Sequence, residues 1–200
     1  GQHYTAARYN IEGDWSGASC LLVAGATAGE ATVRNLNPLS LQADTAIIDA
    51  LTRAGAEITT TRDSVTVRRN ELRAFEFDAT HCPDLFPALA ALAAGCRGPS
   101  VLRGTRRLGH KESDRARTIA DVFSRMGIDI DLSEENLMRI TGGPIRSATV
   151  ESHNDHRIAM AAATAALNSD DSVVVRRAEA VNKSYPGFWD DLRRLTTEKR

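Results

Sequence analysis

The sequence has few of the features that mark several protein classes. Only three of its 200 residues are cysteines, Cys20, Cys82 and Cys96, and none of them form the C-x-x-C spacing of a structural zinc site. An odd number of widely spaced cysteines also argues against a disulfide framework. We therefore expect a protein of a reducing compartment, the cytoplasm, without structural disulfides or a bound metal.

Long apolar runs and an excess of one charge sign are missing as well. No apolar run approaches the roughly 20 residues that span a bilayer, and no signal-peptide pattern opens the chain. The net charge of −1 leaves no basic field to recruit nucleic acid or an anionic membrane. With 42% hydrophobic and 26% charged residues, the composition is that of a soluble globular protein. Because the chain opens with Gly1-Gln2-His3-Tyr4 and has no initiator Met, we expect a piece of a longer protein.

An internal repeat is the strongest organisational feature of the sequence. Glu12-Gly13-Asp14, Cys82-Pro83-Asp84 and His153-Asn154-Asp155 each precede an alanine-rich stretch that reads as a helix. Their aspartates are 70 and 71 residues apart, and each helix leads into a strand rich in aliphatic residues. We therefore expect one domain made of repeats at about 12–81, 82–152 and 153–200, the last of them incomplete.

Each repeat is expected to continue with a second helix, and two of them with a pair of strands. The second helices open at Gln42-Ala43-Asp44, at Lys111 to Asp114 and at Asn182 to Tyr185. The strand pairs are residues 58–68 with 72–78, and residues 137–140 with 148–152. The closing strands of the third repeat are absent or come from outside this chain.

The first helices of the repeats carry almost no polar face. Residues 18–28, 85–94 and 158–167 are apolar nearly all round, which indicates burial, and they are too short to cross a membrane. The simplest architecture that buries these helices is a three-fold α/β domain with the helices inside and the sheets outside. If the three helices run parallel, their N-termini share one end, where backbone N–H groups favour anions.

Charged residues gather at this expected end. Lys111-Glu112-Ser113-Asp114-Arg115 reads as the first turn of a second helix, and Asp84, His156 and Arg157 begin buried helices. Lys183 opens the corresponding helix of the last repeat. The lysines and arginines favour a phosphorylated or carboxylated small molecule, and Asp84 and Glu112 are the candidate acid and base.

Each candidate also has a structural interpretation. Asp84 has the position of an N-cap, as Asp14 and Asp155 do, and the 111–115 cluster is compatible with a capped surface helix whose Arg115 is solvated. His156 is compatible with a half-buried histidine, and the pair His153 and His156 lacks further ligands at metal-site spacing. Arg157 beside an apolar helix is harder to explain structurally, because a charge there needs a partner.

Five motifs together resemble those of a known family. They are Glu12 to Ser16, Cys82-Pro83-Asp84, His110 to Arg115, Asn154 to Met160 and Asn182 to Pro186. In this order and spacing they are similar to the motifs of the 3-phosphoshikimate 1-carboxyvinyltransferase, or EPSP synthase, family. The resemblance covers essentially the whole chain and implies an inside-out α/β barrel of three βαβαββ-type repeats with buried parallel helices. It also implies that this is the C-terminal domain, without the other domain and the family's short N-terminal closing segment.

The resemblance implies a transferase of the shikimate pathway, which serves aromatic amino acid biosynthesis. Phosphoenolpyruvate would donate its carboxyvinyl group to the 5-hydroxyl of shikimate 3-phosphate, with release of phosphate and without a cofactor. By matched position, Asp84 is the base at the shikimate hydroxyl, Glu112 and Lys183 manage the methylene proton and the leaving phosphate, and Lys111 contacts shikimate. The phosphoenolpyruvate ligands are Arg115, Arg157 and Lys183, and His156 lines the same pocket.

The sequence departs from the family pattern at two places, and other functions stay open. Arg107 stands where the family commonly has a small amide residue, and Gln42-Ala43-Asp44 replaces a usual glycine, so Arg107 is a ligand candidate that the resemblance does not carry over. The alternatives are a UDP-N-acetylglucosamine enolpyruvyl transferase, a metal-dependent phosphohydrolase that uses His153, Asp155 and His156, and a non-catalytic anion-binding domain. We expect the 200 residues alone to be inactive.

Overall fold

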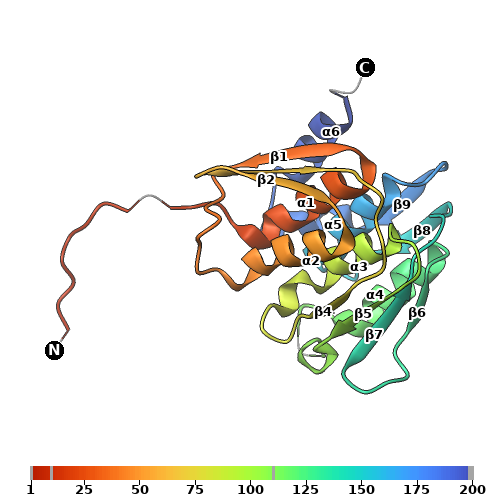
Figure 1. Ribbon diagram of the computed structural model, residues 1–200. Coiled ribbons are helices and arrows are strands. Elements are labelled where there is room, and N and C mark those ends of the chain that lie inside the picture. Colours follow the sequence, from red (N-terminus) through yellow and green to blue (C-terminus); the bar gives the residue numbers. More distant parts are fainter. Residues whose placement is uncertain (1, 10, 110, 198–200) are drawn as a thin grey trace.

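The structure is a computed structural model that describes residues 2–9, 11–109 and 111–197, so His110 of the third motif lies outside the described residues. Figure 1 shows an extended N-terminal segment that runs away from a body in which helices are surrounded by strands. Among the described residues, none of the helices has the length and apolar character needed to cross a membrane.

Helices and strands follow each other in a recurring order. The first group is α1 (Trp15–Ala28), β1 (Glu30–Arg34), α2 (Ile47–Ala54), β2 (Glu57–Thr60), β3 (Ser64–Arg68) and β4 (Glu76–Asp78). The second group is α3 (Phe86–Ala94), β5 (Pro99–Arg103), α4 (Arg115–Arg125), β6 (Asp129–Asp131), β7 (Leu137–Thr141) and β8 (Ala148–Glu151). The third is α5 (His156–Ala166), β9 (Val173–Arg176) and α6 (Phe188–Thr197). Short 3-10 turns cover Ala43–Ala46, Pro83–Leu85, Thr105–Arg107 and Ala178–Lys183.

The helices α1, α3 and α5 form the centre of the body. Every residue of α3 is buried, and nearly every residue of α1 and α5 is buried as well, as their lack of a polar face predicts. At one end Arg157 of α5 reaches Ser16 of α1 and Asp84 just before α3. At the other end Thr27, Gly95 and Leu167, from the C-terminal ends of the same helices, line one cavity. The three buried helices therefore run parallel, as expected.

Three small sheets lie around these helices. Their strand orders are β1-β3-β2, β4-β5-β7-β6 and β8-β9. The pairs β4 with β5 and β8 with β9 are parallel, so the strand that ends one group joins the first strand of the next. The α2 and α4 helices keep one buried face, formed in α4 by residues such as Ile119, Val122 and Phe123.

Several local predictions were wrong. Residues 58–68 are not one strand but the hairpin of β2 and β3, because the polar stretch from Thr61 to Ser64 forms a turn closed by a Thr61 N–H to Ser64 carbonyl hydrogen bond of 2.9 Å. Strand β6 was not expected, since two of its three residues are aspartates. Lys183 ends the 3-10 turn Ala178–Lys183 and does not open a helix.

Candidate active site

The charged segment before α4 is not the first turn of that helix, which corrects the sequence-based prediction. The helix begins at Arg115, and Lys111, Glu112 and Ser113 form a bend before it. Asp114 is the N-cap, since its side chain accepts a hydrogen bond from the Arg117 N–H at 3.4 Å. The residues on either side of the cap, Ser113 and Arg115, both donate to the Asp155 carboxylate, at 3.1 and 2.8 Å.

Arg115 is the centre of a buried ionic network. Its side chain is 0% exposed, so the interpretation of a solvated Arg115 is wrong. Its Nη1 donates to Asp84 at 2.6 Å, its Nη2 to Glu112, and its Nε to Asp155 at 2.8 Å. A guanidinium has five N–H groups in a rigid fork, which suits this arrangement of three carboxylates.

Asp155 is the structural anchor of that network. Its side chain is 0% exposed; it caps α5 by accepting from the Arg157 N–H at 3.0 Å, and it accepts from Ser113 Oγ at 3.1 Å. Burial raises the pKa of this carboxyl, but the hydrogen bond and charge of Arg115 outweigh burial and hold the pKa below 3.8. The expected cap role is confirmed, and the Arg115 contact adds a link between the N-termini of α4 and α5.

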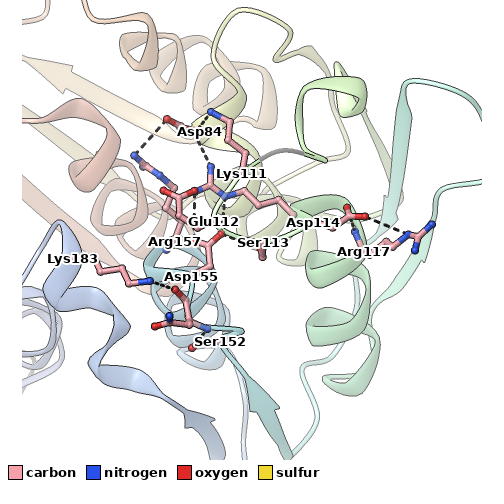
Figure 2. Close-up of polar contacts among 12 residues, drawn as sticks. Asp84, Lys111, Glu112, Ser113, Asp114, Arg117, Ser152, Asp155, Arg157 and Lys183 are labelled. Carbon is pink, nitrogen blue, oxygen red and sulfur yellow. Dashed lines mark hydrogen bonds and ion pairs between the residues drawn. The ribbon is translucent and has the colours of Figure 1, made fainter.

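Asp84 has no capping role, unlike Asp14 and Asp155. It lies in the 3-10 turn before α3, whose N-cap is Leu85 and has no side-chain cap. Its carboxylate contacts Lys111 Nζ at 2.9 Å and faces Arg157 Nη2 at 3.6 Å (Figure 2). Burial raises its pKa, but Lys111, Arg157 and Arg115 together lower the pKa below 3.8, so the carboxylate is ionised at neutral pH.

Arg157 and His156 begin α5 beside this network. Arg157 Nη1 donates to Ser16 Oγ, its side chain is 14% exposed, and among the described residues its buried Nε has no partner. His156 is buried, and neither ring nitrogen has a hydrogen-bond partner among those residues. Burial and the charge of Arg157 lower the pKa of His156 below 6.5, so its ring is neutral at pH 7.

The remaining two candidates lie at the margin of the network. Lys183 is exposed, and its Nζ donates to the Asn154 carbonyl at 2.6 Å, one residue before Asp155 (Figure 2). Arg107 is exposed and donates to the Thr80 carbonyl at 3.3 Å. Among the described residues, no hydrogen bond or ion pair joins Arg107 to Asp84 or Arg115, so the structure does not bring it into the cluster.

A cavity of about 390 Å³ opens beside Asp84 and Arg157. Further lining residues include Ser16, Asp44 and His81. The cavity lies where the N-termini of α1 and α3 meet, with cationic and anionic groups on its wall. In chemical terms the wall offers an ionised base, hydrogen-bond donors for an anion and helix N-termini. Within the described ranges, no group of three or more His, Cys, Asp or Glu side chains is arranged to hold a metal ion.

Sequence reasoning missed three residues that the structure ties to the candidates. Ser16 accepts from Arg157, Ser113 donates to Asp155, and Asp44 lines the cavity. All three residues lie at the start of a predicted helix, where the sequence pattern indicated only a cap or a helix start and no long-range contact. The sequence carried no signal for their long-range partners, which are 141 residues away in the pair Arg157 and Ser16.

The chain is similar to the proteins of one family. Residues 1–192 match the profile described as EPSP synthase (3-phosphoshikimate 1-carboxyvinyltransferase). The 3-phosphoshikimate 1-carboxyvinyltransferase of Thermococcus kodakarensis is 48% identical over 188 residues, 94% of this chain and 47% of that protein. The one of Pyrococcus abyssi is 42% identical over 192 residues, 96% of this chain and 46% of that protein. The chain thus spans about half the length of the curated relatives it matches.

Solved structures have the same architecture. The EPSP synthase from Acinetobacter baumannii matches with a TM-score of 0.82 and 28% identity, over 92% of this chain and 46% of that chain. The enolpyruvyl transferase NikO from Streptomyces tendae matches with a TM-score of 0.68 over 92% of this chain and 43% of that chain, and its 20% identity shows likeness of fold alone. The predicted α/β fold class, an inside-out barrel with buried parallel helices, is confirmed.

Proposed function

Because the chain belongs to the EPSP synthase family, we propose that it is the C-terminal half of a two-domain transferase that makes 5-enolpyruvylshikimate 3-phosphate. The substrates are phosphoenolpyruvate and shikimate 3-phosphate, and the missing half is an N-terminal domain with further substrate contacts. The chain itself is one domain with repeats at about 12–81, 82–152 and 153–200. A length of about half that of the curated relatives supports this proposal.

One observation carries the proposal for the chemistry. At the common N-terminal end of the buried helices, the ionised Asp84 lies within reach of Lys111, Arg115 and Arg157. A carboxylate with a lowered pKa is a proton acceptor at neutral pH, and the surrounding cations and helix N-termini favour anionic substrates. Both requirements of the proposed reaction are therefore present at one place.

In the proposed addition step, the shikimate 5-hydroxyl loses its proton to Asp84 as its oxygen bonds to C2 of phosphoenolpyruvate. The C3 methylene gains a proton from the acid, for which Glu112 and Lys183 are the candidates. In the elimination step a proton of the C3 methyl group returns to the residue that acted as the acid, the C2–O bond to phosphate breaks, phosphate leaves with the bonding electrons, and the C2–C3 double bond re-forms. Each proton transfer needs a group held within hydrogen-bond reach, and the network around Arg115 positions both Asp84 and Glu112.

The proposed substrate contacts are those that the family resemblance implies. Lys111 contacts the shikimate side, and Arg157 and Lys183 hold phosphoenolpyruvate, with His156 as a neutral wall of the pocket. Arg115 is assigned to phosphoenolpyruvate by family resemblance, yet its guanidinium is fully buried and already bonded to three carboxylates. For it to contact substrate, the bond to Glu112, whose side chain is 39% exposed, is the one most easily given up.

The test is phosphate release by the full-length enzyme from phosphoenolpyruvate plus shikimate 3-phosphate. Glu112→Gln and Lys183→Ala should each reduce kcat by about 10²-fold or more, the usual size of a lost acid or base contribution. Glu134→Gln is the matched control, because Glu134 is a half-exposed carboxylate paired with Arg139 on another surface. Unchanged rates in both variants would overturn the assignments. Turnover with UDP-N-acetylglucosamine instead of shikimate 3-phosphate would support the alternative transferase.

A further inference from the structure

We propose that the loop between β1 and α2, residues 35–42, is a surface on which the missing N-terminal half of the same protein packs, with Leu39 and Leu41 as its apolar contacts. The inference rests on the proposed function, which places that half before residue 1. It gives a role to two residues that lie outside all five motifs of the sequence analysis.

The β1–α2 loop lies at the same end of the domain as the candidate active site. The Trp15 backbone N–H, at the start of α1, donates to Gln42 Oε1 at 3.0 Å, and Trp15 Nε1 donates to the Asn37 carbonyl at 3.2 Å. Gln42 also lines the cavity of about 390 Å³ at the candidate site. Leu41 therefore adjoins a residue in the wall of that site.

Two leucine side chains of this loop point into solvent from a well-held backbone. Leu39 is 87% exposed and Leu41 is fully exposed. A single exposed apolar side chain is ordinary, but these two are only two residues apart. The loop is held by polar groups, since Ser40 Oγ and Gln42 Nε2 donate to Glu12 at 2.6 and 3.1 Å. The leucines are thus presented at fixed positions without being needed to hold the loop.

The repeats provide an internal comparison. Residues 35–42 follow β1, residues 104–114 follow β5 and residues 177–187 follow β9. The second of these segments carries Lys111 and the third carries Lys183, both candidate substrate contacts, whereas the first has no charged residue. The central parts of protein interfaces are depleted in charge and rich in apolar contacts. Two segments therefore suit a charged ligand, and the β1–α2 loop suits a protein surface.

The missing half of the protein is the occupant that fits this surface. The curated relatives are about twice as long as this chain, and the proposed function gives the remaining half further substrate contacts, so it has to cover the end that holds the candidate site. The extended N-terminal segment, by which that half would be joined, enters the body at Gly13 (Figure 1). The Gly13 N–H donates to the Asn35 carbonyl at 2.6 Å, so the covalent connection enters beside the loop, which favours this intramolecular contact.

The accessibility of a thiol at Leu41 tests the contact in the full-length protein. Val174→Cys is the matched control for Leu41→Cys, because Val174 is also an exposed aliphatic residue and lies on β9, where its neighbours Val173 and Val175 pack toward the core. Each variant is treated with a short pulse of iodoacetamide, with and without shikimate 3-phosphate, and the labelled peptides are measured by mass spectrometry.

The native thiols of this half give little background in that experiment. All three are buried, and burial raises the pKa of Cys20 to about 11 and the pKa values of Cys82 and Cys96 to about 12. Iodoacetamide reacts with the exposed thiolate, which these residues do not present near neutral pH. The introduced thiols are therefore read separately from the native ones.

The labelling rates decide the proposal. Leu41→Cys should be labelled about tenfold or more slowly than Val174→Cys, because the packed half shields its thiol. Equal rates at the two positions, both with and without shikimate 3-phosphate, would overturn the proposal. Protection that disappears on dilution of the protein would show that a second copy covers the loop, and the proposal would again be wrong.

Kinetics of paired substitutions give a second readout. Leu39→Ser with Leu41→Ser should lower kcat/KM for shikimate 3-phosphate about tenfold, because the apolar contact that brings the two halves together is lost. Leu39→Met with Leu41→Met keeps the apolar contact and should stay near wild type, as should Val174→Ser. An equal loss in the Met and Ser pairs would show that the shape of the loop, and not its apolar surface, matters.

The two experiments separate this inference from the proposed function. If the wild-type protein releases phosphate from the two substrates but the Leu41→Cys thiol is as reactive as the Val174→Cys thiol, this inference is wrong and the proposed function stands. If the wild-type protein releases no phosphate, the proposed function fails, and the labelling contrast, which needs no turnover, still decides whether the other half covers the loop.

Discussion

At their N-terminal ends the buried helices α1, α3 and α5 meet charged side chains, whereas at the C-terminal end of α3 the backbone of Gly142 and Gly143 packs against the helix. Arg115 and Asp155, both 0% exposed, lie at the first end. At the other end the Gly143 N–H donates to the Ala94 carbonyl at 3.1 Å. A Cβ at Gly142 would lie 2.1 Å from the Cys96 carbonyl oxygen.

The difference follows from the polarity of a helix. Its N-terminus presents N–H groups and partial positive charge, which attract anionic groups such as the capping carboxylate of Asp155. Its C-terminus presents carbonyls, for which the N–H of a closely packed glycine is sufficient. The N-terminal end therefore gathers charged side chains, whereas α3 is closed at its C-terminus by backbone packing, and the predictions below test each place against a matched control.

The largest effect is expected from Arg115→Met. It leaves Asp84, Glu112 and Asp155 without their shared cation, and an uncompensated buried charge costs about 3 to 5 kcal/mol. Urea unfolding of the variant and wild-type proteins measures the loss. Arg117→Met, at a side chain that is 86% exposed, should cost less than about 1 kcal/mol. Equal losses of unfolding free energy in the two variants would show that the buried network stabilises the fold no more than the exposed ion pair of Arg117 does.

Gly142→Ala should have an intermediate effect at the opposite end. Its Cβ would approach the carbonyl oxygens of Ala93 and Cys96 to 2.6 and 2.1 Å, so backbone must move, at about 1 to 3 kcal/mol. Gly143→Ala is the control, because nothing lies within 4 Å of its added Cβ. Differential scanning calorimetry of both variants makes the comparison, and a Tm for Gly142→Ala as high as that of Gly143→Ala would refute the close contact.

The smallest expected effect is on the pH dependence of the unfolding free energy, which the carboxylates at the N-terminal end of the buried helices change only at acid pH. The pKa values of Asp84 and Asp155 are lowered in the folded protein, so their stabilisation is complete above about pH 4 and is lost as the pH falls through the folded pKa values, below 3.8. The unfolding free energy of Asp155→Asn should therefore fall less than that of wild type between pH 5 and pH 2. The difference between the two decreases should be on the order of the contribution of one carboxyl group.

Gly142→Ala serves as the reference in that titration, since it changes no titratable group. Its unfolding free energy should fall with pH as steeply as that of wild type, because both carboxylates are intact. If Asp155→Asn shows the same slope as these two proteins, then the acid sensitivity arises elsewhere and the assignment of the buried charge to Asp155 is wrong.

Much of the fold was predictable because its signals are local. Apolar positions all round residues 85–94 require burial wherever the helix ends up, and Asp14 and Asp155 satisfy N–H groups two or three residues away. The same local reasoning failed for Lys111 to Ser113, where the cap at Asp114 places the helix start later than the charge pattern indicated. The hairpin turn after Thr60 was missed because its polar residues interrupt a run that otherwise reads as one strand.

The candidate site was predictable as a set of residues but not as a set of contacts. Family motifs singled out Asp84, Glu112, Arg115 and Arg157, and the structure brings these four together. It leaves Arg107 outside the network and adds contacts of Ser16 and Ser113, to which the motifs that contain them gave no role. Hydrogen bonds between groups 40 or more residues apart, such as Arg115 to Asp155, have no local signature.

By itself the sequence determined the three buried helices, the caps of α1 and α5 and the residue types at the helix N-termini, since each depends on periodicity or on neighbours a few residues away. Only the tertiary structure decided that Arg115 is buried among three carboxylates, that Asp84 is ionised and that Arg157 of α5 reaches Ser16 of α1. The physical reason is that charge interactions depend on distance and burial, which are set when separate helices pack side by side.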